Sequence, residues 1–293
     1  DNFDIIHYLF TPTKLNSSLI KSFAKSKTKT IQTVATLRED LYSNKNFKKM
    51  LFADLIITYS DYSKNKLEKL GFTNAKRIYP GIDLDLYFPA PKDLEVMKKF
   101  GIKSDDFVVT YHGEYTRLGG TDNFMKSIIQ NVNLLRENNI KIILACRVKN
   151  DADKEKKEET TQIIKENELE DCVLLAEKTY TTMEKIYNLA NVASFPIENM
   201  EGKFDVPLVV IEAMACEKPV IISNLPIFKE FANEQNSVRI EAGGFEKFFQ
   251  TVLDIKKNPE HYTEIGKNAR KYVEENFDIK RVAEKYQEIY SNL

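Results

Sequence analysis

Several features that define other protein classes are missing from this chain of 293 residues. No window approaches the roughly 20 uninterrupted apolar residues that a membrane-spanning helix needs, and no segment has the pattern of a signal peptide. The net charge is only −1, from 43 basic and 44 acidic residues, which argues against a nucleic-acid partner. The cysteines, Cys146, Cys172 and Cys216, are few and lack metal-ligand spacing. We interpret them as buried free thiols of a reducing compartment and expect a cytoplasmic protein.

What the chain does contain is a regular alternation of short apolar strands and helices, without internal repeats or low-complexity segments. Alternation at these lengths predicts an α/β protein whose parallel sheets are covered on both faces. Ser60 and Gly71 are expected to cap one helix at its two ends. The predicted strands are 3–10, 29–34, 54–59, 107–112, 141–145, 172–175, 192–196 and 220–222. The predicted helices are 15–26, 47–52, 60–70, 154–167, 182–189 and 208–215, one that begins near Thr121, and three segments from Phe245 onward.

The stretch from Phe204 to Ile221, FDVPLVVIEAMACEKPVI, is the most informative part of the sequence. Its apolar residues recur at helical spacing, and the run ends at Lys218-Pro219 before a β-branched strand. Glu212 lies among these apolar neighbours, where an unpaired carboxylate would cost several kcal/mol. We therefore expect a partner for Glu212, either a protein donor or the hydroxyls of a ligand.

Three phrases carry a resemblance to a known family: Pro80-Gly81-Ile82-Asp83, the loop Gly113 to Gly120, and EAMACEKPVI from Glu212. In order and spacing they resemble the GT-B-fold retaining glycosyltransferases of family four, also called glycosyl transferases group 1. The resemblance covers nearly the whole chain and implies two Rossmann-like domains with parallel sheets.

The cluster of Pro80, Gly81, Pro89 and Pro91 marks the boundary that we expect between the two domains. The resemblance implies a partial, acceptor-side domain at 1–90, joined by the C-terminal helix 277–293, and a nucleotide-sugar-binding domain at 91–276. The first domain is incomplete on this interpretation, because its opening strands would precede Asp1. We therefore expect that the natural beginning of the chain is missing.

The same resemblance implies the transfer of a hexose from a nucleoside-diphosphate sugar, with retention, to a polysaccharide or lipid-linked acceptor. No metal or other cofactor is expected. The family carries two glutamates eight positions apart; Glu212 matches the second, whereas Phe204 occupies the place of the first. Asp205 or Glu201 would have to substitute, and we take Asp205 and Glu212 as the candidate catalytic residues. Asp205 has an alternative role as the N-cap of the following helix.

Donor binding is expected at three places in the second domain. The glycine-bearing loop should approach the diphosphate closely, and backbone amides at the start of the helix should face the phosphates. The family carries Arg directly after the first glycine and Lys before the later one, whereas this chain has Glu114 and either Gly119 or Leu118 there. Main-chain groups near Glu177 to Tyr180 would hold the base. The candidate donor-binding residues are Gly113, Arg117, Gly119, Gly120, Arg147, Lys149, Lys178, Thr179, Val206, Leu208, Val209 and Glu212.

Other interpretations remain open at this stage. Arg117 could be a solvated surface charge, and His112 could reach the cleft, whereas His7 suits a strand core and His261 a helix surface. The lysine-rich segments 21–29 and 45–49 could contact an anionic membrane or simply cover exposed faces. Two other functions compete: a non-catalytic nucleotide-sugar-binding subunit and a sugar-nucleotide epimerase of the same fold.

Overall fold

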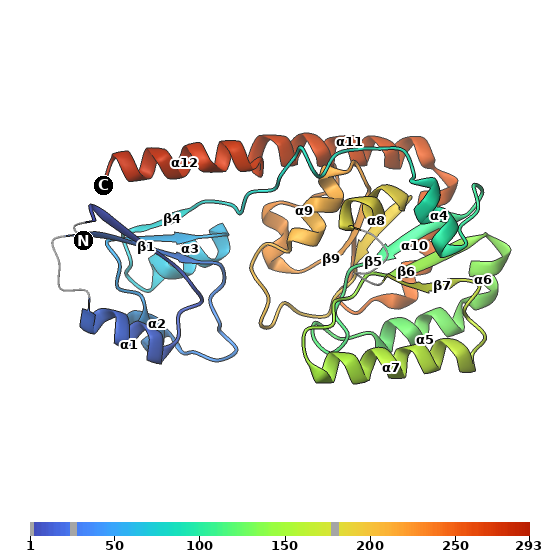
Figure 1. Ribbon diagram of the computed structural model, residues 1–293, viewed down its shortest axis with the longest axis horizontal. Helices are drawn as coiled ribbons and strands as arrows, with labels where there is room; N and C mark the ends of the chain where they lie inside the picture. The colour runs from blue at the N-terminus through green and yellow to red at the C-terminus, as the bar shows by residue number, and fades with distance from the viewer. Residues whose placement is uncertain (1–2, 24–27, 177–181) are drawn as a thin grey trace. The chain divides into compact units, whose positions relative to one another are not determined.

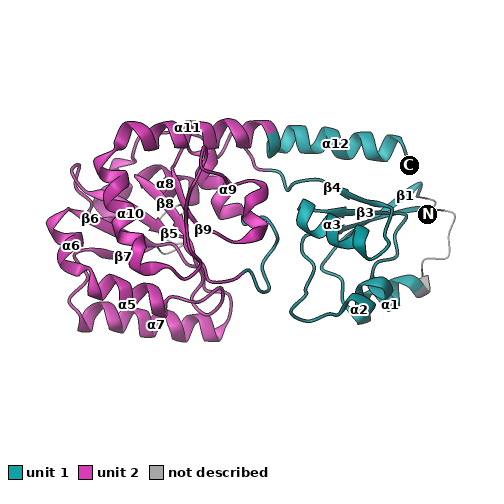
Figure 2. Ribbon diagram, turned by 180° about the vertical axis from the view of Figure 1, so that it is seen from behind, with its two compact units in different colours: residues 1–81, 200–207, 276–293 teal, residues 82–199, 208–275 magenta. Residues whose placement is uncertain are grey.

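The computed structural model describes residues 3–23, 28–176 and 182–293. The chain divides into two compact units, which Figure 2 colours separately. Unit 1 comprises residues 1–81, 200–207 and 276–293, and unit 2 comprises residues 82–199 and 208–275. The boundary that we predicted after residue 90 therefore falls inside unit 2. The reason is local bonding, because the carbonyl of Tyr87 accepts from Arg270 and the amide of Ala90 donates to Asn188.

Unit 1 contains a four-stranded sheet in the order β1-β2-β3-β4, with every pair parallel (Figure 1). Neighbouring residues of its central strands face opposite sides. Ile57 packs with Val282 of the last helix, whereas Ile56 packs with Phe47 on the other face. The strands are β1 (Ile5–Leu9), β2 (Lys29–Val34), β3 (Leu55–Thr58) and β4 (Ala75–Arg77), and the helices are α1 (Lys14–Phe23), α2 (Asn44–Met50), α3 (Asp61–Lys69) and α12 (Ile279–Ser291).

Unit 2 contains a six-stranded parallel sheet in the order β10-β9-β8-β5-β6-β7. Val109 faces the large core formed with α5, α7 and α10, whereas Val108 faces α4 and α8. Its strands are β5 (Phe107–Tyr111), β6 (Ile140–Leu144), β7 (Val173–Leu175), β8 (Val192–Phe195), β9 (Val220–Ser223) and β10 (Val238–Ile240). Its helices are α4 (Leu94–Phe100), α5 (Asp122–Gln130), α6 (Val132–Glu137), α7 (Asp151–Glu166), α8 (Met183–Leu189), α9 (Leu208–Ala215), the 3-10 helix η1 (Pro226–Glu230), α10 (Phe245–Lys257) and α11 (Pro259–Asn276).

The order of strands in unit 2 fixes where a ligand can bind. From β5 the chain first adds β6 and β7 on one side, and then returns to add β8, β9 and β10 on the other. The loops after β5 and β8 therefore leave the sheet in opposite directions. In open parallel sheets this reversal creates the crevice at the carboxyl ends of the strands in which ligands bind.

The expected strands and most of the expected helices are present in the described ranges. Ser60 accepts a hydrogen bond from the amide of Ser63 as the N-cap of α3, and Gly71 has a φ of 93° after the end of that helix. The three cysteines are buried thiols outside any disulfide, as expected. The sequence did not predict α4, α6 or β10, which are short elements of three to seven residues. Among the helices described, none has the length and apolar character needed to cross a membrane.

Candidate functional site

The loop that follows β5 depends on its glycines. A Cβ at Gly113 would lie 2.2 Å from the hydroxyl oxygen of Tyr111, whose side chain is buried. Gly119 has a φ of 100°, and a Cβ there would lie 2.7 Å from Cδ of Glu198. Larger side chains at these two positions would distort the loop. The glycines thus allow the main chain to turn tightly at the carboxyl end of β5, which is where the crevice is expected.

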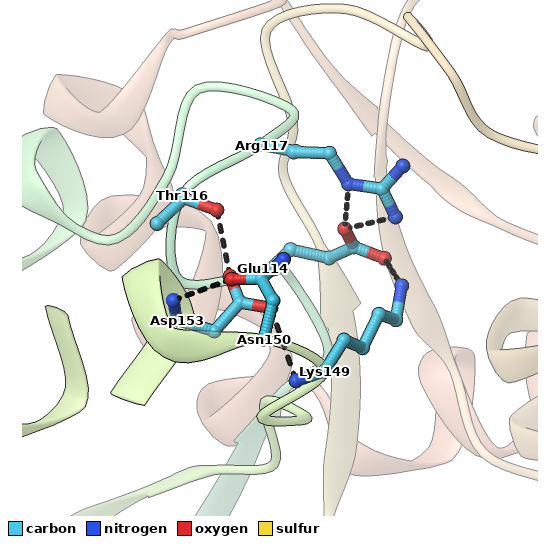
Figure 3. A network of polar contacts seen from close by, with 6 residues as sticks. All are labelled: Glu114, Thr116, Arg117, Lys149, Asn150 and Asp153. Atoms are coloured by element: carbon cyan, nitrogen blue, oxygen red, sulfur yellow. Dashed lines mark hydrogen bonds and ion pairs between the residues drawn. The ribbon is translucent and has the colours of Figure 1, made fainter. Parts of the chain in front are cut away.

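Glu114, next to the first glycine, is the centre of the charged contacts in this loop (Figure 3). Its carboxylate is only 5% exposed, and its Oε2 accepts from Nε and Nη2 of Arg117 at 2.7 and 2.6 Å. Its Oε1 accepts from Nζ of Lys149 at 2.5 Å. Two of the four cations predicted to bind the donor, Arg117 and Lys149, are therefore brought together by one acidic side chain.

A second buried carboxylate, Asp153 at the start of α7, holds the backbone around these cations in place (Figure 3). Asp153 accepts from the hydroxyl of Thr116 at 2.6 Å and from the amide of Lys149 at 3.1 Å. Its own amide donates to the side chain of Asn150, the N-cap of α7. The loop after β5 and the segment after β6 are thus joined independently of Glu114.

Glu212 lies in α9 and is partly buried, as its apolar surroundings predicted. The hydroxyl of Tyr187 donates to its Oε2 at 2.6 Å. Burial raises the pKa of the Glu212 carboxyl, while hydrogen bonds from Tyr187 and Tyr87 and the charge of Arg147 lower it. The expected partner is therefore present in the protein itself. Sequence reasoning missed Tyr187, because an aromatic residue in a predicted helix shows no sign of which carboxylate its hydroxyl will meet.

A pocket of about 370 Å³ adjoins this group in unit 2. Tyr87 and Arg147, two of the three neighbours that lower the pKa of the Glu212 carboxyl, line this pocket. Its volume is within the range of small-molecule sites. The other lining residues are Leu86, Ala145, Cys146, Ala176, Thr182, Met183, Glu184 and Ile186. The predicted base-binding residues Lys178 and Thr179, and the neighbouring Tyr180, lie outside the described residues.

Asp205 has a different environment from Glu212. It belongs to unit 1 and is only 3% exposed. Its Oδ2 accepts hydrogen bonds from the hydroxyls of Ser60 and Ser63 at the start of α3, and its amide donates to the carbonyl of Ala35. Contacts with residues far away in the sequence therefore hold this side chain. They give Asp205 a structural role in unit 1, and its catalytic role stays a prediction.

The other predicted donor contacts come from the start of α9. Leu208 and Val209 lie in its first turn, where backbone N–H groups have no acceptor within the helix. Val206 is buried and belongs to unit 1. The side chains of these residues are apolar, so only their backbone N–H groups can bind an anion.

The three histidines differ in their burial and in their hydrogen-bond partners. His112 is buried after β5 with its Nε2 on Thr110, and burial lowers its pKa to about 3, so it is neutral near pH 7. His7 bonds to Thr33 and Tyr290 in unit 1, and His261 is exposed on α11. No group of three acidic, histidine or cysteine side chains suited to a metal occurs within the described ranges.

Residues 93–272 match the protein family described as glycosyl transferases group 1. No curated protein sequence matches the chain.

Solved structures share the fold over nearly the full chain. HepE of Anabaena, solved with UDP and glucose, is 19% identical, with a TM-score of 0.80 over 99% of this chain and 78% of HepE. Sucrose-phosphate synthase of Thermosynechococcus elongatus is also 19% identical, with a TM-score of 0.79 over 99% of this chain and 73% of its own. A glycosyltransferase of Rickettsia africae is 16% identical, with a TM-score of 0.77 over 99% and 76% of the two chains. These similarities show the two-domain GT-B fold.

Proposed function

Because the chain belongs to the group 1 glycosyl transferases and is thus a nucleotide-sugar-dependent glycosyltransferase, we propose that it moves a hexose with retention of anomeric configuration. The donor is a nucleoside-diphosphate sugar, and the acceptor is a polysaccharide or a lipid-linked saccharide in the cytoplasm. The observation that carries the proposal is the placement of Glu212, whose neighbours Tyr87 and Arg147 line a pocket of nucleoside size.

On this proposal the pocket takes the nucleoside, and Glu212 accepts hydrogen bonds from the ribose hydroxyls. A carboxylate accepts strong hydrogen bonds from hydroxyl groups, and its partly buried position strengthens them. Arg147 lines the same pocket and supplies a positive charge near the phosphates. The structure of HepE with UDP-glucose, which shares the fold, supports a donor of this class.

The leaving diphosphate needs stabilisation as negative charge develops on it. The first-turn amides of α9, including those of Leu208 and Val209, can provide it together with Lys149 and Arg117. These amides and cations can stabilise the diphosphate without a metal ion, and we therefore propose a metal-independent transfer.

The acceptor side belongs to unit 1. Leu15 and Leu19 lie four residues apart on α1 and are 72% and 52% exposed. Lys48 and Lys49 are exposed on α2, which contacts α1. Exposed leucines beside lysines suit the surface of an anionic membrane that carries a lipid-linked acceptor. In a flotation experiment at low salt, the protein should float together with phosphatidylglycerol vesicles. If it does not float with them, the membrane is removed from the proposal.

The donor site is tested by calorimetric titration with UDP, GDP and ADP. One of them should bind, and Glu212→Ala should weaken that binding by about 1–3 kcal/mol, since a charged hydrogen bond to the ligand is lost. Glu264→Ala, at an exposed position of α11, is the matched control and should bind as the unchanged protein does. If no nucleotide binds to the protein, either unchanged or with Glu114 replaced by glutamine, the proposed donor site is wrong.

Turnover separates this proposal from its competitors. Release of the nucleoside diphosphate that depends on a saccharide acceptor supports a transferase. Donor interconversion without an acceptor would indicate an epimerase, and tight donor binding without turnover would indicate a binding subunit.

A further inference from the structure

The Glu114 carboxylate bridges two cations in the way a phosphate group would. Arg117 directs Nε and Nη2 to one oxygen, and Lys149 directs its ammonium group to the other. Arginine forks and lysine ammonium groups are the side chains that bind phosphates in proteins. Both cations keep contact with solvent, because Arg117 is 41% exposed and Lys149 is 31% exposed. A ligand can therefore reach them from the solvent side.

The two segments that carry the cations are also joined by a second carboxylate. Asp153 fixes the amide of Lys149 and the hydroxyl of Thr116, so the segments that carry both cations stay joined when Glu114 releases them (Figure 3). Exchange of the ion pairs leaves the Glu114 carboxylate, which is only 5% exposed, without its two cations. That loss is costly for a buried charge, so only a ligand that brings more negative charge can displace Glu114.

A second acidic side chain lies over the same loop. The side chain of Glu198 fills the space beside Gly119, which has no side chain of its own. The carboxylate of Glu198 accepts a hydrogen bond from the side chain of Asn123 at 2.7 Å. A ligand with two phosphates therefore meets acidic groups as well as cations at this loop. It must take the cations from Glu114 in order to bind them.

We propose that Glu114 acts as an internal anion in the donor site, which the diphosphate displaces from Arg117 and Lys149 when it binds. This inference rests on the proposed function. It adds Glu114 as a residue that sets donor affinity, because Glu114 pairs with the two cations that bind the diphosphate. Glu114 selects for ligands that bring enough negative charge to replace it. A nucleoside without phosphates binds without this exchange.

The test is calorimetric titration of the unchanged protein and of Glu114→Gln with UDP and with uridine. If another base binds instead, its nucleoside diphosphate and its nucleoside are used. The amide keeps the shape of the side chain and removes its charge. We expect binding of the diphosphate to be tighter by at least about three- to tenfold, because the ligand no longer has to displace a carboxylate from two ion pairs. Binding of the nucleoside should not change. Glu159→Gln removes a carboxylate that pairs with Lys156 on the surface of α7, and should leave both affinities unchanged.

A second pair of variants separates a charge effect from a structural one. Lys149→Ala should weaken diphosphate binding more in the Glu114→Gln protein than in the unchanged one, because only there is Lys149 already free of its carboxylate. Asp153→Asn should lower the midpoint of thermal unfolding without the selective gain for the diphosphate.

The outcomes distinguish the two proposals. Diphosphate binding that is equal or weaker in a folded Glu114→Gln protein overturns the internal anion and leaves the donor site standing. An equal gain for nucleoside and diphosphate also overturns it. If neither protein binds any nucleotide, both proposals are wrong, whereas binding by Glu114→Gln alone supports both.

Discussion

The hydroxyl of Tyr187 donates a 2.6 Å hydrogen bond to Oε2 of Glu212, and this bond joins α8 to α9 in unit 2. Tyr187 is fully buried. Burial is the larger cause of the raised pKa of its phenol, and the negative charge of Glu212 is the second. The phenol therefore stays protonated as a donor at all ordinary pH values. The bond fixes the orientation of the carboxylate that the proposed function assigns to the ribose.

Tyr187→Phe removes this donor and leaves a partly buried carboxylate with one hydrogen bond fewer. We expect the free energy of unfolding to fall by about 1–3 kcal/mol, as for a buried polar group that loses its partner. Urea unfolding followed by circular dichroism measures it. Tyr62→Phe, at a tyrosine that is 45% exposed, is the control and should change stability by less than about 0.5 kcal/mol. Equal effects in the two variants would contradict the role of the Tyr187 hydroxyl.

Arg270 of α11 ties together two carbonyl groups of unit 2. Its Nη1 donates to the carbonyls of Tyr87 and Ala215 at 2.7 and 2.8 Å, the latter at the end of α9. Arg270→Ala should lower the free energy of unfolding by about 2–3 kcal/mol, because charged hydrogen bonds to a helix C-terminus are lost. Lys267→Ala, one turn away with a side chain that is 59% exposed, is the matched control. A denaturation midpoint of Arg270→Ala equal to that of the control would show that these bonds contribute nothing.

Asp205 is expected to stabilise unit 1 through Ser60 and Ser63. Asp205→Ala should cost about 2–3 kcal/mol of unfolding free energy, since two buried hydroxyls lose a charged acceptor. Asp40→Ala breaks a pair with Arg38 near the surface and should cost less than about 1 kcal/mol. Thermal unfolding of both variants compares them. Loss of transfer activity in an Asp205→Ala protein of unchanged stability would instead favour the catalytic role.

His112 should make stability depend on pH. Burial lowers its pKa from 6.5 to about 3 in the folded protein, so below pH 6.5 the unfolded chain binds a proton that the folded chain does not. Stability from this residue therefore falls as the pH drops from 6.5 towards 3, with a limiting slope of about 1.4 kcal/mol per pH unit.

Urea unfolding between pH 7 and pH 5 measures this slope, and His112→Gln should reduce it. The variant keeps the contribution of His7, whose pKa burial also lowers. His261→Gln, at an exposed position of α11, should keep the full slope. The assignment to His112 fails if all three proteins show the same pH dependence.

The sequence by itself determined most of the elements and the family. The predicted strands 107–112 and 220–222 are read from a few neighbouring residues, and they correspond to β5 (Phe107–Tyr111) and β9 (Val220–Ser223). The caps Ser60 and Gly71 also depend on local backbone geometry alone. The need of Glu212 for a partner followed from its apolar neighbours, because desolvation of a carboxylate is costly in any fold.

Only the tertiary structure decided which partners these residues have. Glu114 meets Lys149 across 35 positions, Tyr187 meets Glu212 across 25, and Asp205 meets Ser60 across 145. The sequence could list Arg117 and Lys149 as cations but could not show that one carboxylate holds both. Ion pairs and hydrogen bonds act over a few ångströms, so they are set by how strands and helices pack, and a pattern of neighbouring residues does not contain that information.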